Sequence, residues 1–150
     1  MSYKENSIIV SLTSSLLILG YYLVSWLRMY QTEGLNSDRV FRLWIIVIVA
    51  TIVLNILGNI LTSILLNILH AIKTRTDEEV RFVEDERDRL IDLRGTKVAY
   101  FVSSIGVFLS MLTFAFGQPP LVMFSLLILS GLVAQIISDI SRLVLYRRGV

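Results

Sequence analysis

Four apolar runs, separated by short polar segments, dominate the pattern of this chain. They cover residues 8–27, 41–72, 98–116 and 121–146. A helix of about 20 apolar residues crosses the ~30 Å hydrocarbon layer of a bilayer, because each residue adds about 1.5 Å. Each run is therefore predicted to form a membrane-spanning helix. The 32 residues of the second run would extend about 48 Å, so that helix must tilt or project from the bilayer.

The polar segments between the runs indicate how the helices connect. Residues 117–120, Gly-Gln-Pro-Pro, form a short uncharged turn, which predicts that the third and fourth helices are antiparallel neighbours. Asn36, Ser37 and Asp38 precede the second run and are suited to cap its helix. We expect one all-α membrane domain over residues 1–150, with four transmembrane helices in two antiparallel hairpins.

Composition agrees with a membrane protein and excludes several classes of site. Hydrophobic residues make up 55% of the chain and the mean hydropathy is +0.71, which is too apolar for a soluble domain. The chain has no cysteine, which excludes disulfides and Cys-based metal sites. No basic face carries interleaved aromatic residues, so we expect no nucleic acid as a partner. The apolar runs instead predict contact with the lipid bilayer.

Lysine and arginine are distributed unevenly between the two sides of the predicted bundle. With four spans, both termini and the segment 73–97 share one side, which carries eleven basic residues. The other side carries three: Arg28, Arg39 and Arg42. Short loops rich in lysine and arginine stay in the cytoplasm. Both termini are therefore predicted to be cytoplasmic.

The segment 73–97 is the most charged part of the chain, with 7 of its 14 basic and 8 of its 12 acidic residues. Thr76 and Glu79 have the spacing of a capping box, which predicts a helical connector over residues 76–95. On a helical wheel its apolar residues share an arc of about 160°. They are Val80, Val83, Leu90, Ile91 and Leu93. This pattern indicates an amphipathic cytoplasmic helix, rich in salt bridges, that extends the third span.

Three charged residues, Glu86, Arg87 and Arg94, fall within that apolar arc. A charge on the buried face of a helix needs a partner, because an unpaired buried charge is strongly destabilising. We hypothesise that the three meet the cytoplasmic ends of the second and fourth helices. The predicted charge network then has six members: Glu86, Arg87, Arg94, His70, Asp139 and Arg142.

Residues 84–95, EDERDRLIDLRG, lead into a helix that contains Tyr100 and Phe101. This stretch resembles the DERD-type signature of small uncharacterised prokaryotic membrane proteins, which have four predicted spans and carry the signature just before the third. The resemblance implies the same four-span layout and a location in a prokaryotic cytoplasmic (inner) membrane. It implies no reaction, because the biochemical function of that family is not established.

The second run carries polar residues, spaced so that they share one helix face. They are Thr51, Asn55, Asn59, Thr62, Ser63, Asn67 and His70. Amides in hydrocarbon are costly unless hydrogen-bonded, so this face should meet other helices or water. Three interpretations stay open: interhelical hydrogen bonding, contact with another protein, or a polar pathway. The pathway would use Asn55, Asn59, Ser63 and Asn67.

Residues 50–58, ATIVLNILG, are similar to part of the second helix of the fluoride channel family. Members of that family are four-helix proteins that work as dimers, so the similarity implies a dimeric channel as an alternative. The third run, VAYFVSSIGVFLSMLTFAF, lacks the phenylalanine motif of that family. The family also lacks a long charged connector.

Asp139 and His70 are the remaining candidates for intramembrane chemistry. Asp139 is the one acidic residue within a run, and it has the i,i+3 spacing to pair with Arg142 near the cytoplasmic surface. His70 is the only histidine, so a metal site would need carboxylates from the connector or ligands from a second chain. We expect an ion pair, an interfacial histidine, and no metal or cofactor.

The sequence contains no catalytic constellation: it has no Gly-rich phosphate loop, no Ser–His–Asp layout and no paired carboxylates at membrane depth. We therefore expect no enzyme activity. The first hypothesis is a non-catalytic interaction or regulatory protein whose connector helix binds a cytoplasmic or membrane partner. The second is a small ion channel or transporter that uses the polar face of the second helix. It would require a homo-oligomer, because four helices are few to enclose a pore.

Overall fold

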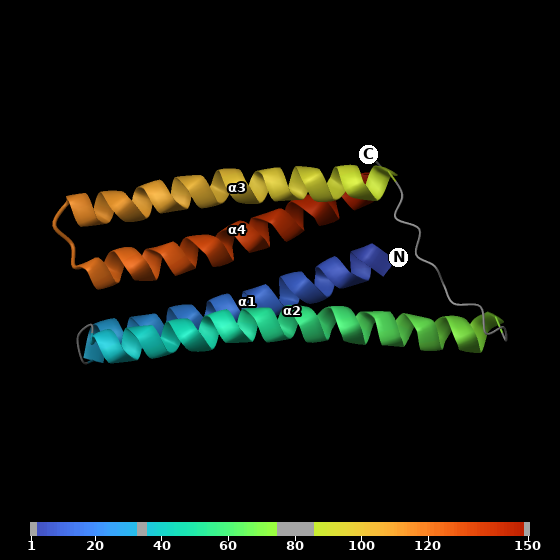
Figure 1. Cartoon of the computed structure of the whole chain (residues 1–150), viewed down its shortest axis with the longest axis horizontal. Helices are drawn as coiled ribbons and strands as arrows, with labels where there is room; N and C mark the ends of the chain where they lie inside the picture. The colour runs from blue at the N-terminus through green and yellow to red at the C-terminus, as the bar shows by residue number, and fades with distance from the viewer. Residues whose placement is uncertain (1–2, 33–35, 75–85, 149–150) are drawn as a thin grey trace.

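The computed structural model describes residues 3–32, 36–74 and 86–148, which form four helices (Figure 1). They are α1 (Tyr3–Thr32), α2 (Ser37–Thr74), α3 (Glu86–Ala115) and α4 (Pro120–Arg148). Each is long and apolar enough to cross a membrane. The prediction of an all-α chain with four helices able to span a bilayer is confirmed.

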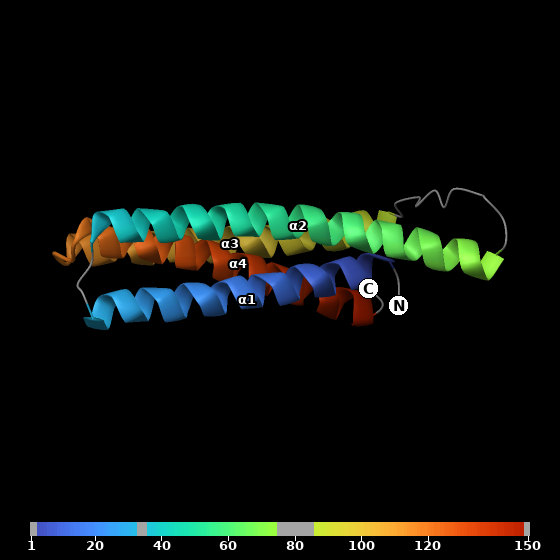
Figure 2. The same cartoon turned by 90° about the horizontal axis from the view of Figure 1, so that it is seen from below.

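The helices extend beyond the apolar runs that predict them. The 38 residues of α2 make it about 57 Å long, and its C-terminal part projects past the ends of the other helices (Figures 1 and 2). α3 begins at Glu86 instead of near residue 98. Residues 86–95 of the predicted connector are therefore continuous with the third span, and residues 76–85 lie outside the described residues.

Local chemistry explains where these helices start and stop. The side-chain oxygen of Asn36 accepts a hydrogen bond from the Asp38 backbone N–H, so Asn36 caps α2 as the sequence predicts. α3 ends in a Schellman motif, in which Gly117 takes a positive φ of 82° and the Gln118 N–H donates to the Thr113 carbonyl. Pro120 then begins α4, because the first helical position needs no N–H donor.

α4 contacts each of the other three helices (Figures 1 and 2). It packs along α3 and against α1, and it contacts α2 more sparsely. α1 packs on α2 as well as on α4, and among the described residues α2 and α3 do not contact each other. α1 begins, α3 begins and α4 ends at one end of the bundle (Figure 1). We call this the terminal end.

The apolar core lies between α1, α2 and α4, in the half away from the terminal end. Tyr22 is almost fully buried there, and its hydroxyl donates to the Ser125 carbonyl oxygen of α4 at 2.7 Å. The core cluster consists of Ile18, Tyr22, Leu43, Val47 and Leu132. This packing holds three helices together, whereas within the described residues α3 packs on α4 alone.

Small residues bring α3 and α4 close together. A Cβ on Gly106 would overlap the Ser130 Cβ, so the two backbones approach at a distance that only glycine permits. Ser110, one turn further along, is buried and donates to the Gly106 carbonyl oxygen. Small residues serve in this way at membrane helix interfaces, where van der Waals packing stabilises association.

Candidate functional site

Asp139 on α4 is the most buried charged side chain in the described part of the chain, with 1% of its surface exposed. Its carboxylate accepts hydrogen bonds from the Ser11 hydroxyl of α1, at 2.8 Å, and from the Gln135 amide of α4, at 3.2 Å. A buried carboxylate is tolerated when it is hydrogen-bonded and paired with a positive charge. The bond from Ser11 to Asp139 therefore links α1 to α4.

Arg142 supplies that positive charge and extends the network to α3. Its guanidinium lies 3.8 Å from the Asp139 carboxylate and 3.6 Å from the Asp92 carboxylate. It also donates to the Thr96 hydroxyl at 3.2 Å. The arginine stem packs on Gly95, where an added Cβ would lie 2.5 Å from the Arg142 Cγ. A larger residue at position 95 would displace the arginine from both carboxylates.

Asn55 connects the network to α2. The Ser11 hydroxyl that bonds Asp139 also lies 3.3 Å from the Asn55 side-chain oxygen. Because a hydroxyl has one proton, the shorter contact with the charged carboxylate is favoured. The Asn55 amide nitrogen donates to the Thr51 backbone carbonyl, one turn earlier. A chain of polar contacts thus runs from α2 through α1 and α4 to α3.

A second group of contacts joins α3 to α4 on either side of the network. The Tyr146 hydroxyl donates to the Asp88 carboxylate at 2.8 Å, and the Arg87 guanidinium lies 3.5 Å from the Tyr146 carbonyl oxygen. The buried Ser138 hydroxyl donates to the Gly95 carbonyl oxygen at 2.9 Å. The first turns of α3 are therefore held on α4 by side chains from both helices.

The structure joins four of the predicted site residues and leaves two apart. Asn55, Asp139 and Arg142 belong to the polar network, and Arg87 contacts the end of α4. Glu86 and Arg94 have exposed side chains. The remaining predicted side chains lie outside the described part of the structure; they are Asn59, Ser63, Asn67 and His70.

The packed face of α3 differs from the one that the helical wheel predicts. Leu90 and Leu93 were expected on the buried arc, but they are 56% and 58% exposed. The face of α3 that packs on α4 carries Ile91 and Gly95, together with Asp88 and Asp92. The physical reason is that Gly95 permits close approach, whereas Arg142 and Tyr146 offer partners that a solvent-facing acid would lack.

Several network residues were missed because their sequence signals are weak. Ser11 is one of many small polar residues in the first run, and nothing in its spacing singles it out. The wheel assigns Asp88 and Asp92 to the solvent side, and Gln135 and Thr96 carry no charge. A pairing of the acidic side of the connector with Arg142 would have found Asp92.

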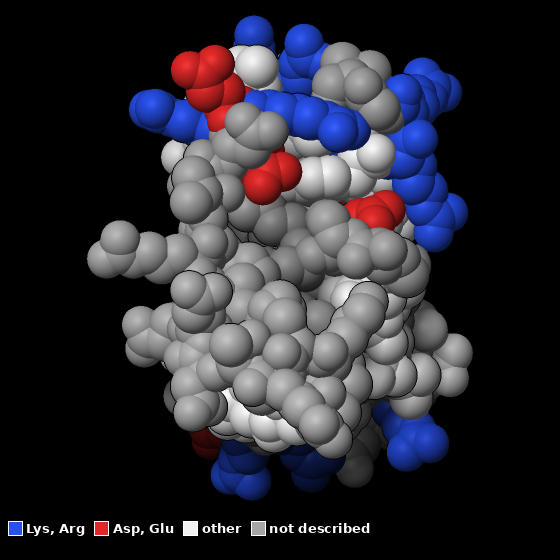
Figure 3. Space-filling model, turned by 90° about the vertical axis from the view of Figure 1, so that its right-hand side faces the viewer, with Lys and Arg blue, Asp and Glu red and all other residues white. Residues whose placement is uncertain are grey.

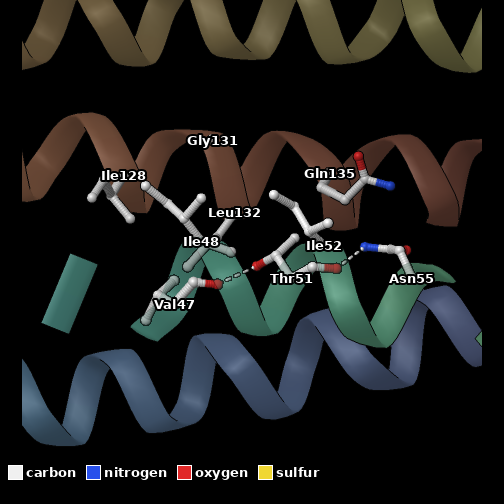
Figure 4. Close-up of a pocket in the computed structure, with 9 residues that line it drawn as sticks. All are labelled: Val47, Ile48, Thr51, Ile52, Asn55, Ile128, Gly131, Leu132 and Gln135. Carbon is white, nitrogen blue, oxygen red and sulfur yellow. Dashed lines mark hydrogen bonds between the residues drawn. The ribbon is translucent and has the colours of Figure 1, made fainter. Parts of the chain in front are cut away.

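Two cavities flank α4 beside the network. The first lies between α2 and α4, has a volume of about 420 Å³, and carries Asn55 and Gln135 at one end with Val47 and Ile128 at the other (Figure 4). The second lies between α3 and α4, has a volume of about 310 Å³, and includes polar residues of both helices. Gly131 and Gln135 line both cavities.

The network offers hydrogen-bond donors and acceptors, not a cluster of metal ligands. Among the described residues no group of three or more His, Cys, Asp or Glu side chains comes together. The arrangement is suited to hold helices in register and to contact a polar group in the adjoining cavities. Comparison with protein-family models, with curated proteins and with solved structures found no match.

Proposed function

We propose that this is a non-catalytic integral membrane protein of a prokaryotic cytoplasmic membrane, and that it works by binding another protein through the first turns of α3. The binding surface is the side of α3 that faces away from α4. We call it the outer face, and it comprises Glu86, Leu90, Leu93, Arg94 and Lys97, all of which are exposed.

The exposure of Leu90 and Leu93 is the observation that carries this proposal. The ~30 Å hydrocarbon layer takes about 20 helical residues, and counting back from Ala115 places its boundary near Thr96. The two leucines then lie at the level of the lipid headgroups or beyond. Apolar side chains that stay uncovered at such a level are typical of a surface that another molecule covers.

The rigid attachment of this segment supports the same proposal. Asp88 and Asp92 contact Tyr146 and Arg142 of α4, so the outer face is presented without the need to order a flexible segment. Preorganisation of this kind lowers the entropy lost on binding. Glu86 and Arg94 flank the leucines and would set the specificity and the orientation of the partner.

The distribution of charge supports a cytoplasmic position for this face. Lys and Arg side chains gather along the α3 and α4 side of the terminal end (Figure 3). Arg28, Arg39 and Arg42 are the basic residues that flank the opposite end. Because basic flanks are retained in the cytoplasm, we propose that the terminal end, and with it the outer face, is cytoplasmic.

Site-specific photocrosslinking in living cells tests the proposal. A benzophenone amino acid at Leu93 should give one discrete adduct with a second protein. The control is the same amino acid at Leu17, which is 70% exposed on α1 at membrane depth and should give no such adduct. Reversing the charges of Glu86 and Arg94 together should abolish the Leu93 adduct, whereas reversing those of Arg147 and Arg148 should not.

Two outcomes would contradict the proposal. One is the absence of a protein adduct at Leu93 in cells where the chain is inserted and stable. The other is an adduct that survives the double reversal of Glu86 and Arg94, because the contact would then be independent of the outer face.

A dimeric channel or transporter that uses the polar face of α2 is the second candidate. Its support is that Asn55 borders the cavity between α2 and α4. Against it, both ends of the Asn55 amide contact groups of the same chain, the Ser11 hydroxyl and the Thr51 carbonyl. Ion flux in proteoliposomes that falls on Asn55→Leu substitution would favour the channel, and no flux for the unmodified protein would discard it.

A further inference from the structure

The two cavities on α4 lie next to each other, one beside α2 and one beside α3. They share Gly131 and Gln135, so they meet at these two residues. Their volumes, about 420 and 310 Å³, lie within the ~300–1,000 Å³ range typical of ligand sites. We call this space the α4 groove.

Gly131 keeps the groove open. An added Cβ at this position would have no heavy atom within 4 Å, unlike the close contacts at Gly95 and Gly106. Helix packing therefore gives no reason for glycine here. The missing side chain instead leaves the floor of the groove clear at the point where its two halves meet.

The polarity of the groove changes along its length. The half beside α2 is lined mainly by aliphatic residues, among them Val47, Ile52, Ile128 and Leu132. The half that extends toward the terminal end has a more polar lining, which combines Ala99 and Ala134 with Thr96, Ser103, Gln135, Ser138 and Arg142. From Ile128 to Arg142 the groove follows α4 for 14 residues, which is about 21 Å.

Two polar groups in the groove make no hydrogen bond within the described residues: the Ser103 hydroxyl and the side-chain oxygen of Gln135. The amide nitrogen of Gln135 donates to Asp139. Thr51 and Asn55 differ, because their side chains donate to backbone carbonyls of α2. Ser103 and Gln135 thus offer a donor and an acceptor to a molecule in the groove.

The terminal ends of α3 and α4, toward which the groove extends, carry more basic than acidic residues. Over residues 86–97 and 139–148, seven lysines and arginines outnumber four acidic residues. The basic residues are Arg87, Arg89, Arg94, Lys97, Arg142, Arg147 and Arg148. Figure 3 shows the Lys and Arg side chains of this end gathered over α3 and α4. Positive charge at a membrane surface attracts anionic headgroups.

We propose that the α4 groove binds an anionic phospholipid of the leaflet at the terminal end. Its acyl chain lies in the aliphatic half between α2 and α4. Its phosphate lies at the terminal end of the polar half, within reach of Arg142, and its glycerol esters lie deeper, within reach of Gln135 and Ser103. The change from apolar to polar lining follows the order of chain and headgroup in that leaflet, and the basic residues of the terminal end favour a negative headgroup.

The test uses a phosphatidylglycerol that carries a photoreactive group on its acyl chain. The purified full-length protein is reconstituted in phosphatidylcholine vesicles with a trace of this lipid, irradiated and mapped by mass spectrometry. Labelling should concentrate on the groove residues of α2 and α4. Phe108, which is 63% exposed on α3, reports contact with ordinary bilayer lipid.

A leucine at position 131 should fill the groove without disturbing the packing of the chain. Gly131→Leu should lower groove labelling about tenfold, equivalent to about 1.4 kcal/mol, and leave labelling at Phe108 unchanged. Gly20→Leu is the matched control, because Gly20 is also exposed and also has no neighbour within 4 Å of an added Cβ. Ser103→Ala should lower groove labelling by phosphatidylglycerol and by a photoreactive phosphatidylcholine alike, without lowering stability, because both lipids carry the glycerol esters that Ser103 contacts.

Each of the alternative results would overturn the proposal. Groove labelling that is unchanged in Gly131→Leu would show that the lipid contacts the outer surface only. Equal labelling by phosphatidylcholine and phosphatidylglycerol would remove the anionic selectivity. A photoreactive amino acid at Ile128, which lines the groove, that crosslinks one copy of the chain to another would assign the groove to a protein interface.

Discussion

The contact between Ser11 and Asp139 should contribute measurably to stability, because it links α1 to α4 through a buried carboxylate. Hydrogen bonds to charged groups contribute about 1.5–3 kcal/mol in proteins. Those measured between membrane helices average about 0.6 and reach about 1.7 kcal/mol. The short distance of 2.8 Å and the 1% exposure of Asp139 place this bond near the upper membrane value. We expect Ser11→Ala to lower the free energy of unfolding by about 1.5 kcal/mol.

Removing the carboxylate should cost more. Asp139→Ala eliminates the bonds from Ser11 and Gln135 and leaves Arg142 paired with Asp92 alone. Breaking a buried charged pair costs about 3–5 kcal/mol, and the remaining Asp92 contact moves the expectation to the lower end, about 3 kcal/mol. Because both substitutions remove the same bond, the double variant should lose less than the sum by about 1–1.5 kcal/mol.

A double-mutant cycle in bicelles measures this coupling, with the free energy of unfolding obtained by steric trapping. The matched control is a second cycle that pairs Thr13→Ala with Asp139→Ala. Thr13 is exposed, and its hydroxyl donates to the Ile9 carbonyl of its own helix. The Thr13 and Asp139 substitutions should be additive. Coupling between Ser11 and Asp139 within about 0.3 kcal/mol of zero would refute the inference that this bond holds α1 on α4.

Three further substitutions test the packing and the ends of the helices, each through the free energy of unfolding of the reconstituted protein. Gly106→Ala should lower the free energy of unfolding by about 1–3 kcal/mol, because the new Cβ would overlap Ser130 and force α3 away from α4. An unchanged free energy would mean that the two helices are not in close contact. Tyr146→Phe should cost about 1.5–3 kcal/mol through loss of its bond to the Asp88 carboxylate, and an unchanged stability would place that contact in water. Gly117→Ala should cost about 1–2 kcal/mol because a side chain is strained at a φ of 82°, and a neutral result would contradict the Schellman turn.

The sequence was sufficient to predict the four apolar helices and the chemistry of two helix ends, the start of α2 and the turn after α3. Twenty-residue apolar runs have few other structural solutions, because backbone groups in a bilayer must be hydrogen-bonded within the segment. The cap at Asn36 and the turn at Gly117 depend on neighbouring residues only, so local rules predict them.

The face of α3 that packs on α4 could not be predicted from the helical wheel. A wheel ranks faces by hydrophobicity, but here the approach is governed by Gly95 and by the acids that meet Arg142 and Tyr146. The exposed positions of Leu90 and Leu93 follow from that packing. Which helix lies opposite an acid depends on tertiary contacts, and a single sequence does not encode them in any local pattern.

The candidate site was predicted in part for a related reason. Asp139 and Arg142 stand out because charges are rare in spanning helices, and their i,i+3 spacing gives the ion pair observed here. Ser11 lies 128 residues away from Asp139 in the sequence. Its role arises only when α1 packs beside α4.

The central claim is that the outer face of α3 lies on the cytoplasmic side of a four-span protein, and cysteine accessibility tests it most directly. The chain has no cysteine of its own, so single substitutions at Arg94, on the outer face, and at Gln118, in the turn before α4, report one position each. In intact cells a membrane-impermeant maleimide should label Gln118→Cys from outside and should label Arg94→Cys only after the membrane is permeabilised. Labelling of Arg94→Cys in intact cells would contradict the account.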